Sequence, residues 1–158
     1  MAEDLAEKII QHIDQAAALY HRLILVVAPA GTGKTAALQE VHRRTLMPLI
    51  NVNLELSRSL LDLTERQRAL QVPRLLAAVV NANSPEVVLL DNIELLFDIS
   101  LRQDPLRLLQ MLARNMTVVA AWNGTVVNGQ LIYATPDHNE YRRYSSHDLL
   151  IVNLETTT

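Results

Sequence analysis

The sequence predicts an α/β fold in which helices cover both faces of a mainly parallel sheet, forming a three-layer sandwich. Short apolar runs alternate along the chain with stretches of helical periodicity, which is the pattern of repeated βαβ units. A glycine-containing turn joins the first such run to the next helical stretch. The composition, 49% hydrophobic and 20% charged over 158 residues, is that of a globular chain with a sizeable core, and one domain over residues 1–158 is expected.

The amino-terminal part predicts a helix followed by a βαβ unit. Apolar residues recur four apart at Leu5, Ile9, Ile13 and Ala17, so an amphipathic helix is expected to end near Tyr20. The next elements are a strand, a helix and a second strand, expected at residues 23–27, 34–45 and 48–53. The first strand is short, continuously apolar and β-branched, which indicates burial on both faces in a parallel sheet.

The middle of the chain predicts further helices and two more strands. Residues 57–81 have helical spacing, and Pro73 is expected to break or start a helix, giving two helical pieces. A third buried strand is expected at 87–91 and a fourth at 117–122. Between them, Asp104 and Pro105 have the pattern of an N-cap and a first-turn proline.

A β-hairpin insertion is predicted after the fourth strand. Asn128 and Gly129 suit the positive φ angles of a tight two-residue turn between two apolar runs. A short helix is expected at 137–145 and a last strand at 149–153. Because only residues 155–158 follow, no carboxy-terminal helical lid is expected.

The strongest functional motif is APAGTGKT, residues 28–35, between the first strand and the following helix. It matches the phosphate-binding loop of P-loop NTPases, with Ala28 in place of the usual first glycine. Backbone amides of such a loop surround a β-phosphate, while Lys34 reaches the β and γ oxygens and the Thr35 hydroxyl ligates Mg²⁺. The loop residues expected to bind nucleotide are Ala30, Gly31, Thr32, Gly33, Lys34 and Thr35.

A carboxylate ends the third predicted strand, where ligands bind in open α/β sheets. We expect Asp91 to bind nucleotide through the Mg²⁺ shell, the alternative being a helix N-cap. Glu94 is the nearby residue able to polarise an attacking water. Asn92 stands where many hydrolysing relatives have a glutamate, so the sequence indicates binding more firmly than hydrolysis.

Two further positions are candidates for catalysis. Asn123 follows the fourth strand and is expected to direct its amide at the γ-phosphate or the water, unless Asn123 and Gly124 form only a turn. Arg142 and Arg143 are candidate arginine fingers for a neighbouring subunit in a homo-oligomer. A solvated face or a partner contact is the alternative that we favour for them, and DNA contact through this basic and aromatic cluster is weakly supported.

Several function classes are excluded by composition. The chain has no cysteine, which excludes disulfides, thiol nucleophiles and cysteine-ligated zinc, and its histidines show no metal-ligand spacing. The formal charge of −3 argues against a basic surface overall. No apolar run approaches the roughly 18 residues of a membrane span, and the first residues are acidic, so no membrane association and a cytoplasmic location are expected.

These motifs resemble the AAA+ and related P-loop ATPases. More narrowly, DNIELLF at residues 91–97 and YATPDHNEYR at 133–142 resemble the BrxF family, the small P-loop proteins of type III BREX antiviral systems. The resemblance implies ATP and Mg²⁺ as ligands and a role in phage defence beside other BREX proteins. The missing lid departs from AAA+ motors and favours a switch, loader or complex subunit.

The resulting prediction is a weak Mg²⁺-dependent ATPase acting as a regulatory or assembly subunit. The alternatives are a nucleotide-sensing module without hydrolysis and, less favoured, a small-molecule kinase. A kinase lid is usually rich in arginine, and residues 115–140 contain none. A GTPase is disfavoured because no guanine-reading Asn-Lys-x-Asp segment occurs, although the choice of ATP follows from the resemblance alone.

Overall fold

The computed structural model describes residues 2–134 and 137–154, and it confirms the predicted α/β fold. Five parallel strands form the central sheet in the order β2-β3-β4-β1-β7. They are β1 (Leu23–Ala28), β2 (Leu49–Asn51), β3 (Val87–Asp91), β4 (Thr117–Val127) and β7 (Leu150–Asn153). Strands β5 (Gln130–Tyr133) and β6 (Arg142–Ser145) extend β4 as an antiparallel ribbon.

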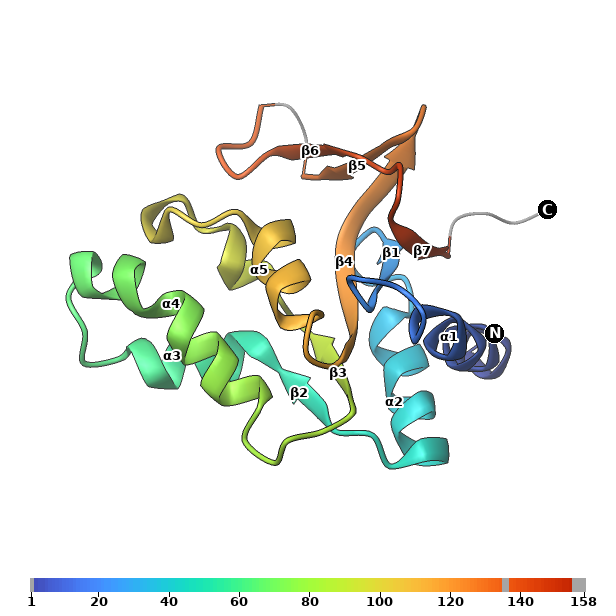
Figure 1. Ribbon diagram of the computed structural model, residues 1–158. Helices are drawn as coiled ribbons and strands as arrows, with labels where there is room; N and C mark the ends of the chain where they lie inside the picture. Colours follow the sequence, from blue (N-terminus) through green and yellow to red (C-terminus); the bar gives the residue numbers. More distant parts are fainter. Residues whose placement is uncertain (1, 135–136, 155–158) are drawn as a thin grey trace.

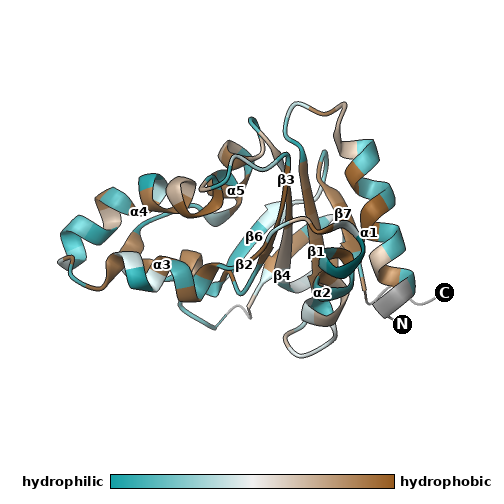
Figure 2. Cartoon of the chain, turned by 90° about the horizontal axis from the view of Figure 1, so that it is seen from below, coloured by the Kyte–Doolittle hydropathy of each residue, from teal (hydrophilic) through white to brown (hydrophobic). Residues whose placement is uncertain are grey.

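Helices cover both faces of this sheet, as expected for a three-layer sandwich (Figure 1). The helices are α1 (Ala2–Ala16), α2 (Lys34–Thr45), α3 (Val52–Leu60), α4 (Glu65–Val80) and α5 (Pro105–Leu112), with short 3₁₀ turns at Glu94–Phe97 and Ile99–Leu101. The sheet has a hydrophobic core on each face, and alternate residues of β1 point into each of them. Ile24 and Val26 pack with α1 and α2 on one face, whereas Leu25 and Val27 pack with α3, α4 and α5 on the other. Figure 2 shows the apolar sides of the helices turned toward the sheet.

The prediction that Pro73 would break a helix was wrong. Pro73 lies inside α4, and the two helical pieces separate earlier, where Thr64 and Gln67 form a capping box at the start of α4. A proline leaves the carbonyl four residues before it without its helical donor. Here the Gln103 side chain donates to that carbonyl, Ala69 O, at 2.8 Å. A partner outside the helix therefore replaces the bond that Pro73 cannot make.

The carboxy-terminal part contains two confirmed predictions, the β4–β5 hairpin and the last strand, β7, and one error, the helix expected at 137–145. The β4–β5 hairpin turns at Asn128 (φ 50°) and Gly129 (φ 76°), as predicted. Strand β4, however, continues through Gly124 instead of turning there. Residues 142–145 form strand β6 instead of a helix, because β5 offers them an edge to pair with. The expectation about residues 155–158 lies outside the described residues.

Glycine is required inside β4 by the closeness of the neighbouring strand. A Cβ on Gly124 would lie 1.8 Å from the Ile132 carbonyl oxygen. The Trp122 indole donates to the same oxygen at 3.2 Å, and its ring contacts Phe97, Tyr133 and Tyr144 edge-on. This aromatic cluster attaches the β5–β6 ribbon to the main core.

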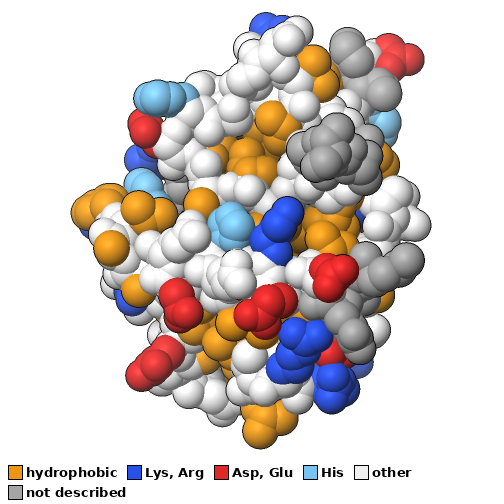
Figure 3. Space-filling model, turned by 90° about the vertical axis from the view of Figure 1, so that its right-hand side faces the viewer, with side chains coloured by type: hydrophobic (Ala, Val, Ile, Leu, Met, Phe, Trp, Pro, Cys, Tyr) orange, Lys and Arg blue, Asp and Glu red, His pale blue; other side chains and the backbone are white. Residues whose placement is uncertain are grey.

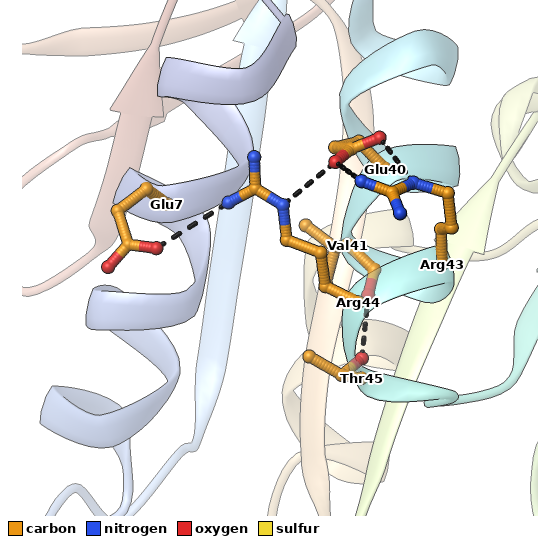
Figure 4. A network of polar contacts seen from close by, with 6 residues as sticks. All are labelled: Glu7, Glu40, Val41, Arg43, Arg44 and Thr45. Carbon is orange, nitrogen blue, oxygen red and sulfur yellow. Dashed lines mark hydrogen bonds and ion pairs between the residues drawn. The ribbon is translucent and has the colours of Figure 1, made fainter.

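The amino-terminal helices are joined by an ion-pair network at the surface (Figure 4). Arg44 of α2 contacts Glu40 at 2.8 Å and reaches Glu7 of α1 at 3.5 Å. Arg43 also pairs with Glu40, and these hydrogen bonds lower the pKa of the Glu40 carboxyl to about 2. The first helix ends at Ala16, earlier than the predicted Tyr20.

The surface of the α1 side carries both kinds of charge. Figure 3 shows acidic and basic side chains intermingled on this face, where the described residues form no continuous basic area. None of the helices in residues 2–134 and 137–154 combines the length and the apolar character needed to cross a bilayer.

Candidate functional site

The carboxyl ends of parallel strands place the predicted site residues along one edge of the sheet. Ala28, the last residue of β1, is in register with Asn123 of β4, and Asp91 of β3 is in register with Asn51 of β2. The loop after β1 therefore opens beside β4, with the end of β3 on the far side of β4. This is the topological position at which open α/β sheets bind ligands.

The loop between β1 and α2 has the backbone that its glycines permit. Gly31 (φ 77°) and Gly33 (φ 100°) both adopt left-handed conformations, and Gly33 caps α2. Nothing lies within 4 Å of a Cβ built on either residue, so the dihedral angles, and not crowding, require glycine. Ala28 ends a strand and has no positive φ, so alanine in place of the usual first glycine brings no backbone strain.

Lys34 is buried beneath this loop, with 5% of its surface exposed. Its ammonium donates to Ala28 O at 2.8 Å and to Pro29 O at 2.7 Å, so the loop itself orients the charge. Burial lowers the pKa of the Lys34 ammonium, while the nearby charges of Asp91 and Glu94 act in the opposite direction. A partly desolvated ammonium held in this way is well suited to contact phosphate oxygens.

Thr35 and Asp91 form the hard-oxygen pair of the site. The Thr35 hydroxyl donates to Asp91 Oδ2 at 2.6 Å, and Asp91 Oδ1 accepts the Asn92 amide at 2.9 Å. Asp91 thus contacts the loop and does not cap the following 3₁₀ turn, whose N-cap is Ile93. A hydroxyl and a carboxylate side by side are the ligand types that Mg²⁺ uses together with phosphates, so these residues fit that ion.

Glu94 is held from two directions by side-chain amides. Asn53 donates to its Oε1 at 3.1 Å, and Asn123 donates to its Oε2 at 2.8 Å. The structure thereby brings the predicted Glu94 and Asn123 together beside Lys34. Asn92, at the position where hydrolysing relatives carry glutamate, is exposed and has φ 52°.

Asn53 is the site residue that the sequence reasoning missed. Its Oδ1 accepts the backbone amide of Leu95 at 2.8 Å, and its backbone N–H donates to Asn92 O at 2.8 Å. Asn53 therefore connects the beginning of α3 to the turn that carries Glu94. A polar residue at the end of the strand expected at 48–53 was the available signal, because the end of β2 adjoins the end of β3.

The predicted arginines lie apart from this group, on β6. Arg142 pairs across the ribbon with Tyr133, which in turn pairs with Gly124 of β4. Its guanidinium donates to Gln103 O at 2.9 Å within the same chain, whereas Arg143 is exposed. Their role as arginine fingers between subunits stays a prediction.

Two adjoining clefts border the site. The first, of about 330 Å³, lies between the phosphate loop and the β4–β5–β6 ribbon, and includes Ala30, Asn123 and His138. The second includes Asn53 and Glu94, and Glu140 lines both clefts. Burial raises the pKa of the Tyr133 phenol in the first cleft, and the charges of Glu94 and Glu140 raise it further, so this hydroxyl stays neutral.

A known family model covers most of the chain. The family model described as ATPase family associated with various cellular activities (AAA) matches residues 24–135, which is more than half of the chain. The matched region contains the phosphate loop, Asp91, Glu94 and Asn123. No curated protein matches the chain at a significant level.

Proposed function

Because this chain belongs to the AAA family of ATPases, we propose that it binds Mg·ATP and hydrolyses it slowly. We further propose that it acts as a regulatory or assembly subunit of a bacterial BREX defence complex. The observation that carries the proposal is the convergence of Lys34, the Thr35–Asp91 pair and Glu94 at one sheet edge. Each of these groups has a distinct task in phosphoryl transfer.

Nucleotide binding rests on the phosphate loop and its two charged neighbours. The loop amides and Lys34 provide donors for the phosphate oxygens, while Thr35 and Asp91 would hold Mg²⁺. When bound, the ion neutralises negative charge on the β and γ phosphates. Lys34 has to exchange the Ala28 and Pro29 carbonyls for phosphate oxygens, and its buried position keeps it within the loop during that exchange.

Slow turnover follows from the surroundings of Glu94. A carboxylate that polarises water must point a free lone pair at it. Each oxygen of Glu94 accepts one amide hydrogen, which leaves a lone pair free but fixes the direction in which the carboxylate points, so Glu94 has to break one of these bonds to turn toward a water that lies elsewhere. Asn92 does not substitute for it, because a carboxamide accepts no proton.

The assignment to a defence complex rests on the resemblance of residues 91–97 and 133–142 to BrxF proteins. The first of these segments carries Asp91 and Glu94, and the second begins at Tyr133, in the wall of the first cleft. We therefore propose other BREX proteins as partners. Assembly of several copies on ATP would allow the exposed Arg143 to contact a neighbouring subunit, and mass photometry with and without Mg·ATP tests whether the copies assemble.

A nucleotide sensor without turnover is the second candidate. It is favoured by the two amide bonds that occupy Glu94 and by the amide at position 92. In such a protein, ATP binding alone would change the affinity for partners. The two functions differ in one measurable quantity, the release of phosphate.

The test combines calorimetry with phosphate release. We expect wild-type protein to bind Mg·ATP and to release phosphate slowly, Lys34→Ala to bind weakly, and Glu94→Gln to bind but not release phosphate. Glu65→Gln, an exposed carboxylate in the first turn of α4, is the matched control and should behave as wild type. Binding without any phosphate release would favour the sensor, and absence of binding by folded protein would refute both functions.

A further inference from the structure

We propose that His138 contacts the terminal phosphate of the bound nucleoside triphosphate from within the same chain. This inference rests on the proposed function and adds a residue to its site. His138 follows β5 and lies in the segment 133–142, outside the phosphate loop and the segment that carries Asp91 and Glu94. The evidence consists of its position in the cleft, the fixed orientation of its ring, and the charge of its surroundings.

The position follows from the fold of the ribbon. Figure 1 shows β5 and β6 across the upper end of β4, the end at which β1 leads into the phosphate loop. His138 lines the same cleft of about 330 Å³ as Pro29 and Ala30 of that loop. Asn123 lines this cleft too and contacts Glu94, so the cleft borders the end of the triphosphate at which a water would attack.

The orientation of the imidazole is set by the backbone of its own turn. The Glu140 amide donates to His138 Nδ1 at 3.0 Å, and the Tyr141 amide donates to His138 O at 3.1 Å. Because Nδ1 accepts this hydrogen, the proton of the neutral ring lies on Nε2. The far nitrogen of His138 is therefore a donor in either charge state, and this is the group that a phosphate oxygen requires.

The charge balance of the clefts also favours this role. The described residues that line the two adjoining clefts include no lysine and no arginine, so His138 Nε2 is an N–H donor set among carboxylates. Glu94, Asp98 and Glu140 line the same space and would repel a triphosphate. Arg142, on the neighbouring strand, is bonded to Gln103 O. A contact from His138 would offset part of this repulsion at the terminal phosphate.

Two substitutions distinguish the roles of the two ring nitrogens of His138. His138→Asn keeps an acceptor near Nδ1 for the Glu140 amide but removes the far donor, whereas His138→Gln provides a donor at nearly the reach of Nε2. His147→Gln, at an exposed histidine in the turn after β6, is the matched control. The affinity of each protein for Mg·ATP and for Mg·ADP is measured by calorimetry.

We expect His138→Asn to weaken Mg·ATP binding by roughly 10-fold, the effect of losing one hydrogen bond to a charged group, and to leave Mg·ADP binding within about 2-fold. His138→Gln should recover part of the loss, and His147→Gln should match wild type. Unchanged Mg·ATP affinity in His138→Asn, or an equal loss for both nucleotides, would overturn the inference. A wild-type protein that binds neither nucleotide would instead refute the proposed function.

Discussion

Replacement of Asn53 by alanine should make the protein a faster ATPase. The side-chain amide of Asn53 donates to Glu94 Oε1 at 3.1 Å, and its side-chain oxygen, Oδ1, accepts the backbone amide of Leu95 at 2.8 Å. Removing the side chain frees one oxygen of Glu94, while Asn123 still holds the other. Glu94 can then pivot about its remaining bond to Asn123 and present Oε1 to a water without first breaking the bond to Asn53.

The size of the effect follows from the geometry of that bond. A hydrogen bond to a charged group contributes about 1.5–3 kcal/mol, and 3.1 Å is near the long end of the usual range, so the lower value applies. Since about 1.4 kcal/mol corresponds to a factor of ten in rate, turnover should rise roughly 10-fold. The Leu95 amide loses its partner, which should lower the free energy of unfolding by about 1 kcal/mol.

The assay is phosphate release at saturating Mg·ATP, with thermal unfolding measured in parallel. Asn51→Ala is the matched control, because the Asn51 side chain caps α3 through the Leu54 amide, whereas that of Asn53 bonds to Glu94. Losing that cap should reduce stability by a similar amount, about 1 kcal/mol, without raising turnover. If Asn53→Ala binds Mg·ATP normally but turns it over no faster than wild type, Asn53 does not restrain Glu94, and the explanation for slow hydrolysis fails.

Three further predictions concern binding, folding and pH. Lys34→Ala should reduce Mg·ATP affinity at least about 10-fold while the circular dichroism spectrum stays native, because Lys34 contacts loop carbonyls and not the apolar core; a loss of native structure would contradict this placement. Gly124→Ala should lower the free energy of unfolding by about 3 kcal/mol, measured by urea denaturation, because the new Cβ would lie 1.8 Å from Ile132 O. An unfolding midpoint equal to that of the wild type would show that β4 and β5 move apart to accommodate it. The Glu40 pKa of about 2 lies below the ordinary 4.5, so its ion pairs stabilise the fold fully above about pH 4.5 and progressively less as the pH falls toward 2. Glu40→Gln should remove this part of the acid dependence of stability, and an unaltered pH profile would argue against the network.

Some errors of the sequence analysis share one origin, a partner distant in the chain. Pro73 is accommodated because Gln103, 30 residues later, donates to Ala69 O. Residues 142–145 become a strand because β5 lies beside them. Propensity rules consider a residue and its near neighbours, so they could not include these long-range bonds.

The phosphate loop could be located from the sequence because its chemistry is contained in eight consecutive residues. Gly31 and Gly33 provide left-handed backbone, Lys34 the charge and Thr35 the hydroxyl, and the short apolar run before them places the loop at a strand end. The Asn128–Gly129 turn was predictable for the same reason. Dihedral preference and the order of side chains along a turn are local properties, and a sequence records them directly.

The grouping of Asn53, Glu94 and Asn123 was decided by the tertiary structure alone. Asn53 follows β2, Glu94 follows β3 and Asn123 lies within β4, and they meet because β2, β3 and β4 are adjacent in the sheet. The same applies to His138, which lines one cleft with Pro29 and Ala30 of the phosphate loop because the β5–β6 ribbon pairs with β4. Strand order depends on how the whole core packs, and therefore contacts between strand ends become visible only once the sheet is assembled.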